Sequence, residues 1–316
     1  MGMNVRDRNA GFKRGQEQVV GFDKDTAIDS QSYGAPGALI FYVDPNNAQA
    51  TDYGNTGRDP SVPLATVAAA VALCRDHMGD TIEVAANDAW QYAPHYRPTA
   101  IVESLVIPMT KGGIRIVGAS TNPLGVQWEP ADDSEACITV RAIDVLIEGF
   151  LFTAPNNTGT TGIHCEWGVT VATVGENLTV RGCMFFNIDY AITLDYSWYC
   201  QIYGNSFDTI AVAAILNTSV TGDAEYLAIH DNSFLDCVLA ISLEDSDNNF
   251  IYNNRINGNA NGTDNFIDLT GGNDNLVADN WLACTIALYD VTCSDATSGA
   301  WLNNHCTNGD TTAPPV

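Results

Sequence analysis

The sequence predicts an all-β solenoid, in which the chain winds through short strands that stack as successive coils. The first observation behind this prediction is a motif with an apolar residue, two spacers, an asparagine, a spacer and a second apolar residue. It recurs as IYGNSF (202–207), IHDNSF (229–234), IYNNRI (251–256), VADNWL (277–282) and WLNNHC (301–306), after the earlier copies IEGFLF (147–152) and VRGCMF (180–185) that lack the asparagine.

The second observation is a strand-like motif that lies between these copies. It reads AITL (191–194), AISL (240–243), FIDL (266–269) and, more loosely, IAL (286–288). The intervals between copies of the first motif run from 22 to 33 residues. A solenoid tolerates such uneven intervals, because its strands stack ~4.8 Å apart and the extra residues form outward loops.

Asparagines at the shared position of the first motif predict a structural ladder that runs from coil to coil. The set is Asn205, Asn232, Asn254, Asn280 and Asn304. We expect each to take a left-handed backbone conformation at a tight bend, which asparagine tolerates better than most residues. Stacked amides can also hydrogen-bond along the solenoid. A structural ladder is therefore favoured over a catalytic row.

The apolar residue two places after the shared position predicts an inward-facing row that fills the core. The row is Phe185, Phe207, Phe234, Ile256 and Leu282. Because strand side chains alternate between the two faces, the residue two places before the asparagine is expected to point outward.

This outward position is a candidate contact surface. It holds Arg181, Tyr203, His230, Tyr252 and Ala278, and the loop DYSWYC (195–200) adds Tyr196, Trp198 and Tyr199. Tyr and Arg are favoured in interfaces, so the row suits an oligomer interface or a platform on which sugars stack. Stacking that only stabilises neighbouring coils explains the same residues, and the sequence does not separate these interpretations.

The N-terminal part of the chain carries a resemblance to a known family. The segments IFYVDPNN (40–47), YGNTGRDPSVPLATVAAAV (53–71) and GDTIEV (79–84) resemble the opening of right-handed parallel β-helix proteins of the pectate-lyase-like superfamily. The resemblance covers about residues 38–306 and is closest to the non-catalytic or spike-type β-helix proteins of phage virions. It implies a right-handed single-stranded parallel β-helix, and it is specific for fold rather than for function.

The resemblance also implies a first strand, a loop rich in Gly and Asn, and an amphipathic α-helix that caps the open end of the solenoid. Val67, Val71 and Cys74 would form the apolar face of this helix, and Gly79 would end it. A cap is needed because an open coil exposes unpaired strand edges. We expect an extended N-terminal arm at 1–36, first strands and cap at 37–110, the β-helix body at 111–306 and a C-terminal tail at 307–316.

Composition and charge exclude several classes of function. The chain has 316 residues, of which 46% are hydrophobic, yet no apolar run approaches the ~18 residues that a membrane span needs. The polar start MGMNVRDRNAGFKRG (1–15) has no apolar signal-peptide core. A formal net charge of −25 argues against a nucleic-acid partner and against insertion into an anionic membrane. The nine cysteines match no zinc-ligand spacing and predict buried free thiols, as in a reducing cytoplasm.

The first 24 residues hold five of the 13 positive charges. This segment is either a solvated leader or an arm that docks on an acidic partner. In the second case, positive side chains would meet the partner, and a small apolar cluster would anchor the arm. The residues concerned are Arg6, Arg8, Lys13 and Arg14, followed by Val19, Val20 and Phe22.

Known chemistries of the superfamily find little support. The G-H-G and R-I-K motifs of pectin hydrolases are absent. Pectate lyases need a Lys or Arg base, and after residue 120 the candidates are Arg141, Arg181 and Arg255. A weak catalytic pair is Asp231 with Asp279, which stacking would place ~9–10 Å apart, near the upper limit for inverting glycosidases. The alternative is that both are turn aspartates that bond their own backbone.

Acidic loops give a weak metal candidate. Asp245, Asp247 and Asp274 lie in EDSDNN (244–249) and GGNDN (271–275) and could bind Ca²⁺ through oxygen ligands. The loops lack the regular spacing of a calcium loop, so solvated turns are the alternative. No other cofactor is expected.

Three classes of function remain open, and a structural virion protein of a phage is the favoured one. It would decorate a capsid or form a spike or fibre, attach to other virion proteins through residues 1–36, and be made in the host cytoplasm. A homo-oligomer such as a trimer, and a glycan, are further partners that this interpretation allows. The alternatives are a carbohydrate-active enzyme, either a polysaccharide lyase or a glycoside hydrolase, and a non-catalytic glycan-binding module.

Overall fold

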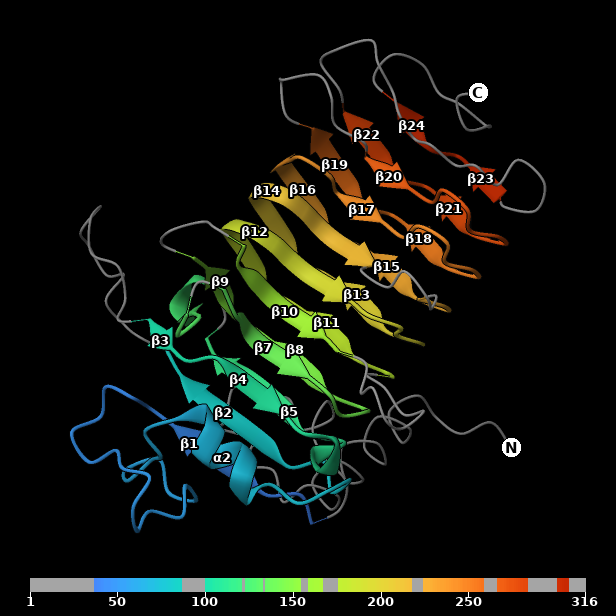
Figure 1. Cartoon of the computed structure of the whole chain (residues 1–316). Helices are drawn as coiled ribbons and strands as arrows, with labels where there is room; N and C mark the ends of the chain where they lie inside the picture. Colours follow the sequence, from blue (N-terminus) through green and yellow to red (C-terminus); the bar gives the residue numbers. More distant parts are fainter. Residues whose placement is uncertain are drawn as a thin grey trace, which may run out of the picture.

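A right-handed single-stranded parallel β-helix makes up the described chain, which confirms the predicted fold (Figure 1). The structure is a computed structural model that describes residues 37–86, 100–120, 123–132, 134–154, 159–166, 176–217, 224–258, 266–283 and 300–306. The predicted arm at 1–36 and tail at 307–316 lie outside the described residues. Every pairing between the described strands is parallel, as a winding solenoid requires.

Sheet A forms one long face of the solenoid. Within the described residues its strands, in spatial order, are β1 (Ile40–Val43), β2 (Thr81–Ala85), β5 (Arg115–Ala119), β8 (Leu146–Glu148), β11 (Thr179–Arg181), β13 (Gln201–Tyr203), β15 (Ala228–His230), β18 (Phe250–Tyr252), β21 (Leu276–Ala278) and β23 (Ala300–Leu302). The middle residue of each three-residue strand points into the core, and its two neighbours point outward. Ile202, Ile229 and Ile251 are such inward residues, and they pair in register.

Sheet B forms two further rows of strands. One row is β3 (Ile101–Val102), β6 (Gln127–Glu129), β9 (Leu151–Thr153), β12 (Met184–Leu194), β14 (Ser206–Asn217), β16 (Ser233–Cys237), β19 (Arg255–Gly258), β22 (Trp281–Ala283) and β24 (His305–Cys306). The other is β4 (Leu105–Ile107), β7 (Ala136–Val140), β10 (Thr161–Cys165), the second halves of β12 and β14, β17 (Ile241–Ser242) and β20 (Ile267–Asp268). The long strands β12 and β14 belong to both rows, and pairing continues through the left-handed bends at Asn187 and Thr209.

Helix α2 (Val67–Leu73) packs against β1, β2 and β4 at the N-terminal end of the solenoid (Figure 1). Its buried face includes Val67 and Val71, and Cys74 follows it into the core, as the spacing predicted. The Thr66 hydroxyl caps the helix by accepting the Ala69 N–H. The carboxylate of Glu103, from the next coil, accepts the N–H groups of Val67 and Ala68, which the first turn leaves without helical partners.

The predicted end of the helix at Gly79 is wrong. The helix ends at Leu73, because Cys74 already has an extended backbone with ψ of 146°. The ammonium of Lys111 donates to the carbonyls of Ala72 and Cys74 and so satisfies the last turn. Gly79, with φ of 69°, serves the turn before β2 instead. Two 3₁₀ turns, η2 (Met109–Lys111) and η3 (Pro123–Gly125), complete the regular structure of the described residues.

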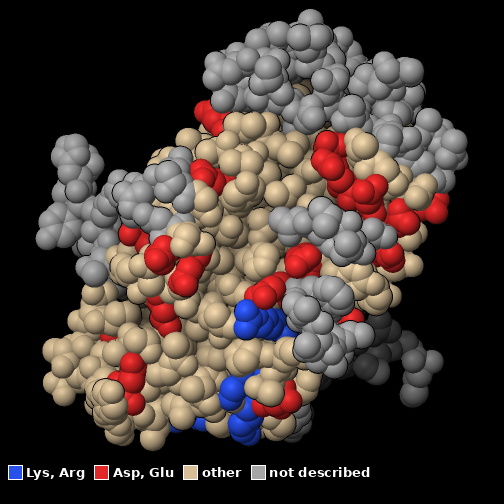
Figure 2. Space-filling model, viewed as in Figure 1, with Lys and Arg blue, Asp and Glu red and all other residues tan. Residues whose placement is uncertain are grey.

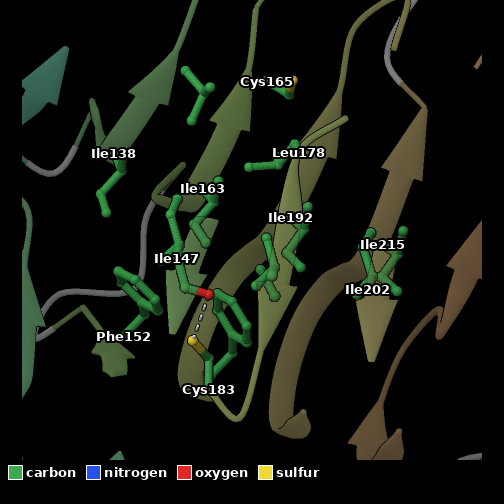
Figure 3. Packing of buried hydrophobic residues seen from close by; sticks show 14 of the residues in the cluster. Ile138, Ile147, Phe152, Ile163, Cys165, Leu178, Cys183, Ile192, Ile202 and Ile215 are labelled. Carbon is green, nitrogen blue, oxygen red and sulfur yellow. Dashed lines mark hydrogen bonds between the residues drawn. The ribbon is translucent and has the colours of Figure 1, made fainter. Parts of the chain in front are cut away.

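A continuous apolar core runs along the solenoid (Figure 3). The predicted inward row is confirmed: Phe185, Phe207, Phe234, Ile256 and Leu282 are at most 1% exposed and pair in register. Phe152 extends the row by one coil. The ring centroids from Phe152 through Phe185 and Phe207 to Phe234 are 5.0, 5.1 and 4.7 Å apart, and each adjacent pair is stacked.

Six described cysteines are free and buried, which confirms the prediction for these residues. Burial raises the pKa of the thiols of Cys74, Cys183 and Cys237 to about 12. Figure 3 shows the Cys183 thiol directed at the carbonyl oxygen of Ile147, 3.9 Å away. Cys284 and Cys293 lie outside the described residues. None of the helices in the described ranges has the length and apolar character to cross a bilayer.

Replacing Phe234 with alanine tests the core register. We expect Phe234→Ala to lower the free energy of unfolding by about 3–5 kcal/mol, since it removes a fully buried ring from a stacked row. The matched control is Leu235→Ala, because the adjacent Leu235 side chain is 39% exposed. Urea denaturation measures both variants, and a cost below about 1 kcal/mol for Phe234→Ala would contradict the register.

The buried thiols should resist alkylation in the folded protein. A thiolate is the reactive form, and a pKa of about 12 keeps Cys74, Cys183 and Cys237 protonated at pH 8. Iodoacetamide treatment followed by peptide mass mapping should leave these three unmodified until urea unfolds the chain. Their labelling in the native protein would show that the coils open far more readily than this packing allows.

Candidate functional site on the outer face of sheet A

In the coils that carry a ladder asparagine, the corner between the sheet A strand and the following sheet B strand turns through a left-handed residue. This residue is the one before the ladder asparagine, which corrects the prediction that the asparagine itself takes that conformation. The φ angles lie between 52° and 65° at Gly204, Asp231, Asn253, Asp279 and Asn303. Gly, Asn and Asp occupy the position because they tolerate this backbone conformation best.

The ladder asparagines fill the inside of these corners and are all buried. The Asn232 Nδ2 donates to Asn254 Oδ1 at 3.0 Å and to the carbonyl of Ile202 at 2.8 Å. Its backbone N–H donates to the same Asn254 Oδ1 at 3.1 Å. The pattern repeats from Asn205 to Asn304, so each amide satisfies buried backbone groups of the neighbouring coils.

A second, shorter ladder escaped the sequence analysis. Asn249 and Asn275 are buried, and Asn275 Oδ1 accepts the Asn249 N–H at 2.9 Å. Asn249 Oδ1 in turn accepts the N–H of Leu227 at 2.9 Å. The signal that could have revealed this ladder is an asparagine five residues before the ladder position in two successive coils.

Asp231 and Asp279 occupy the left-handed turn position in two coils, with Asn253 in the coil between them. One Asp231 oxygen bonds the Nδ1 of His230 at 2.7 Å, and the other accepts from the Asn253 amide. The bond to His230 is the main reason why the pKa of Asp231 is lowered. Both aspartates therefore lie at turns, as the alternative expected, but the Asp231 carboxylate bonds the side chains of His230 and Asn253 and not its own backbone.

The acidic loops also serve turns. Asp245 and Asp274 have left-handed backbones with φ of 55° and 56°. Asp247 Oδ1 accepts the backbone N–H of Asn273 at 2.6 Å and thereby ties two successive loops together. In the described parts of the chain, no group of three or more His, Cys, Asp or Glu side chains is arranged to hold a metal ion.

The predicted outward row lies in register on sheet A. The rings of Tyr203 and His230 stack with centroids 4.9 Å apart, and those of His230 and Tyr252 stack 4.6 Å apart. Their interplanar angles are 3° and 9°, so the ring faces contact one another. Only ring edges are left toward solvent along most of the row. The geometry therefore favours coil-to-coil stabilisation and disfavours sugar stacking on these three rings.

The loop aromatics form separate pairs beside this row. Tyr196 and Trp198 lie 5.5 Å apart, and Tyr199 stacks on Tyr226 at 5.1 Å. Tyr199 and Tyr226 are 50% and 42% exposed. Tyr226 was not identified from the sequence, although it lies six residues before its ladder asparagine, as Tyr199 does.

Arg181 holds the N-terminal end of the outward row. Its guanidinium donates to a Glu148 carboxylate oxygen at 2.8 Å and to the Tyr203 hydroxyl at 3.0 Å. Burial lowers the pKa of Arg181, but the bonds to Glu148 and Tyr203 outweigh burial and raise it overall. The side chain is 24% exposed, so the charge is fixed in place at the surface.

Arg181 lines a surface pocket of about 270 Å³ that lies over strands β5, β8, β11 and β13. The pocket is also lined by Arg115, Asp144, Leu146, Asn177, Thr179, Gln201 and Tyr203. Most of this lining is polar. Figure 2 shows blue side chains gathered on the lower half of the visible face, with red ones spread over both halves. A pocket with two arginines is thus unusual for a chain of net charge −25.

Comparison with known proteins gives one family and several distant structures. The family model described as periplasmic copper-binding protein (NosD) matches residues 135–309, and the search of curated proteins found no match. A structure named Geobacillus virus E2 ORF18 is 10% identical with a TM-score of 0.41, covering 85% of this chain and 62% of that chain. Pectate lyase Pel9A is 13% identical with a TM-score of 0.38, covering 89% and 80%. The Dettilon tailspike protein (gp208) is 12% identical with a TM-score of 0.31, covering 94% and 65%.

Removing one rung tests the asparagine ladder. We expect Asn232→Ala to lower the free energy of unfolding by about 2–4 kcal/mol, because it leaves buried backbone and amide groups without partners. The control is Ser233→Ala at the exposed next residue, which should change stability by less than about 0.5 kcal/mol. Equal effects of the two substitutions in urea denaturation would show that the ladder bonds contribute little.

Proposed function

We propose that this chain, which belongs to the NosD family of β-helix proteins, is a non-catalytic structural protein of a phage virion. It would decorate a capsid or form a spike, and residues 1–36 would attach it. The observation that supports a non-catalytic role is that polar side chains on the outer face of sheet A bond one another. Arg181 bonds Glu148 and Tyr203, and Asp231 bonds His230 and Asn253. In the described residues Arg181 joins neighbouring coils, and the carboxylate of Asp231 is engaged by His230 of its own coil and by Asn253 of the next.

Charge distribution supports attachment through the N-terminal segment. Residues 1–36 hold five positive and five negative side chains, so the entire net charge of −25 belongs to residues 37–316. Within that segment, the first 14 residues hold four positive side chains and one negative side chain. A locally positive segment favours contact with an acidic surface.

Copper, which the family description names, does not fit the described residues. Copper sites use imidazole, thiolate or thioether ligands in close groups. The six described cysteines are buried singly or in pairs in the apolar core, and the His164 Nδ1 is bonded to the Thr193 hydroxyl at 2.7 Å. We therefore assign no step to copper in this chain.

Truncation of the N-terminal segment tests the attachment. Full-length protein should co-purify with phage particles from the source of the gene and should rebind to particles that lack it. A variant without residues 1–30 should stay folded by circular dichroism and should fail to bind. Particle binding by the truncated protein, or no association of the full-length protein with any particle, would refute the virion hypothesis.

Grouped substitutions separate the two parts of the proposed arm. Single charge changes should have little effect, because exposed ion pairs contribute only ~0–1 kcal/mol each and many copies bind one particle by avidity. Replacing Arg6, Arg8, Lys13 and Arg14 by Gln in a single variant should weaken rebinding to particles. The binding that remains should no longer depend on salt concentration. Replacing Val19, Val20 and Phe22 with Ser should weaken it at every salt concentration.

A glycan-binding module is the second candidate, and the polar pocket beside Arg181 is the observation that favours it. This role is compatible with a virion protein that contacts a host surface. The enzymatic alternative predicts release of reducing sugar from a polysaccharide panel, with loss of release in Asp231→Asn. Binding without release would favour the module over the enzyme.

A further inference from the structure

The N-terminal end of the solenoid is covered unevenly. Three rows of strands begin at this end: β1 opens sheet A, and β3 and β4 open the two rows of sheet B (Figure 1). The outer side of β1 is bridged where Val43 pairs with Leu64, and α2 packs against β1, β2 and β4. Among the described strands, β3 pairs with β6 alone. One strand edge is therefore left without a cover from the described elements.

The open edge of β3 presents the backbone of Val102. The N–H of Glu103 donates to the Glu129 carbonyl of β6 at 3.1 Å. Because backbone groups alternate in direction along a strand, the N–H and C=O of Val102 point away from β6. The Val102 side chain is 63% exposed, more than any other described Val, Leu or Ile. Such an edge is a template for a further strand, and native proteins usually cover it.

A pocket of about 190 Å³, called here the β3 pocket, lies against this edge. Its two polar lining residues, Thr66 and Glu103, already bond N–H groups in the first turn of α2. A ligand must therefore be held mainly by apolar contact. The volume lies below the ~300–1,000 Å³ of small-molecule sites, so the pocket suits one large side chain of a peptide. The apolar lining is Pro45, Ala65, Ala68, Ala100, Ile101 and Val102.

The N-terminal segment of the same chain can reach this pocket. The Arg75 guanidinium, just after α2, donates to the Gly37 carbonyl at 2.8 Å, so the described chain begins at the same end of the solenoid. Phe22 precedes Gly37 by 15 residues, which span at most about 50 Å when extended. The seven residues of α2, between Arg75 and the pocket, are only about 10 Å long. The segment also holds Val19, Val20 and Phe22, which are residue types that favour strands.

Charge favours the same placement. Carboxylates surround the β3 pocket: Asp44 directly precedes Pro45, and Glu129 pairs with Val102. Asp52 accepts the N–H groups of two lining residues at 2.9 and 3.1 Å. The first 14 residues of the chain hold four positive side chains and one negative side chain. Opposite charges would thus hold the start of the chain beside the pocket.

We propose that residues 19–22 of the same chain add to the open edge of β3, with the Phe22 ring in the β3 pocket and the segment's backbone bonded to Val102. In such strand addition, backbone bonds supply affinity and side-chain pockets supply selectivity. The docking does not depend on a virion role. One consequence rests on the proposed function: a particle that binds the arm would first have to displace it from β3.

Hydrogen exchange of the full-length protein, read at single amides by mass spectrometry, measures the docking. Full-length Phe22→Ser should raise the exchange rate of the Val102 N–H about tenfold, because it favours local opening of the edge. The Glu103 N–H, which is bonded to β6, should keep its rate and serves as the internal control. Equal exchange at Val102 in both proteins would overturn the proposal. Protection of Val102 that disappears on dilution would assign the edge to a second copy and would also overturn it.

A pair of valines on neighbouring strands separates docking from folding. Val102→Lys places a charge in the β3 pocket and should speed exchange of the amides of residues 19–22. Val106→Lys is the matched control, because Val106 is 44% exposed on β4 and does not line the pocket. It should leave those amides unchanged. If neither variant changes them, or both change them equally, with native circular dichroism, the site is refuted.

Failure of the docking is distinguishable from failure of the proposed function, because Val102→Lys keeps the arm intact. Rebinding to particles is measured separately from hydrogen exchange. Normal rebinding by the wild-type protein without protection of Val102 would remove only the docking. Protection of Val102 without any particle binding would remove only the virion role. Stronger rebinding by Val102→Lys than by Val106→Lys would support both.

Discussion

The buried corner between sheet A and sheet B is the constraint on which the rest of the molecule depends. Backbone groups at such a corner are shielded from water and must find hydrogen-bond partners inside the protein. An asparagine amide, with its donors and acceptor, bonds the backbone of the coils on both sides. Because the same amide occupies the same place in coil after coil, it fixes the vertical register of the strands. The outward rows of sheet A are in line as a consequence.

Register explains which parts of the structure could be read from the sequence. Wherever the motif repeats, with or without its asparagine, the core row from Phe185 to Leu282 and the outward row from Arg181 to Tyr252 follow by counting residues. The left-handed residue was misplaced by one position, because asparagine suits both a left-handed backbone and a buried amide site. Both uses occur side by side at Asn253 and Asn254. The composition of the motif does not separate them.

Other features do not follow from periodicity. The helix was expected to continue to Gly79, but the backbone becomes extended at Cys74, and Lys111, far along the chain, satisfies the last carbonyls. Arg115 and Asp144 line the pocket beside Arg181 from coils that precede the first copy of the motif. Their place on the sheet could therefore not be found by counting from a shared motif position. The mutual stacking of Tyr203, His230 and Tyr252 is one of the interpretations that the sequence left open. It follows because parallel strands space their side chains at about the stacking distance of aromatic rings.

Strands β12 and β14 have a consequence for how the solenoid opens. In a stacked array each coil is held only by its neighbours, so unravelling proceeds inward from the two ends. These two strands are 11 and 12 residues long and stay paired through their bends. They belong to the same coils as β11 and β13, which contribute to the pocket beside Arg181. The pocket therefore sits on the segment that should be the last to exchange its amide hydrogens with solvent. The pocket should therefore keep its shape while the terminal coils open locally.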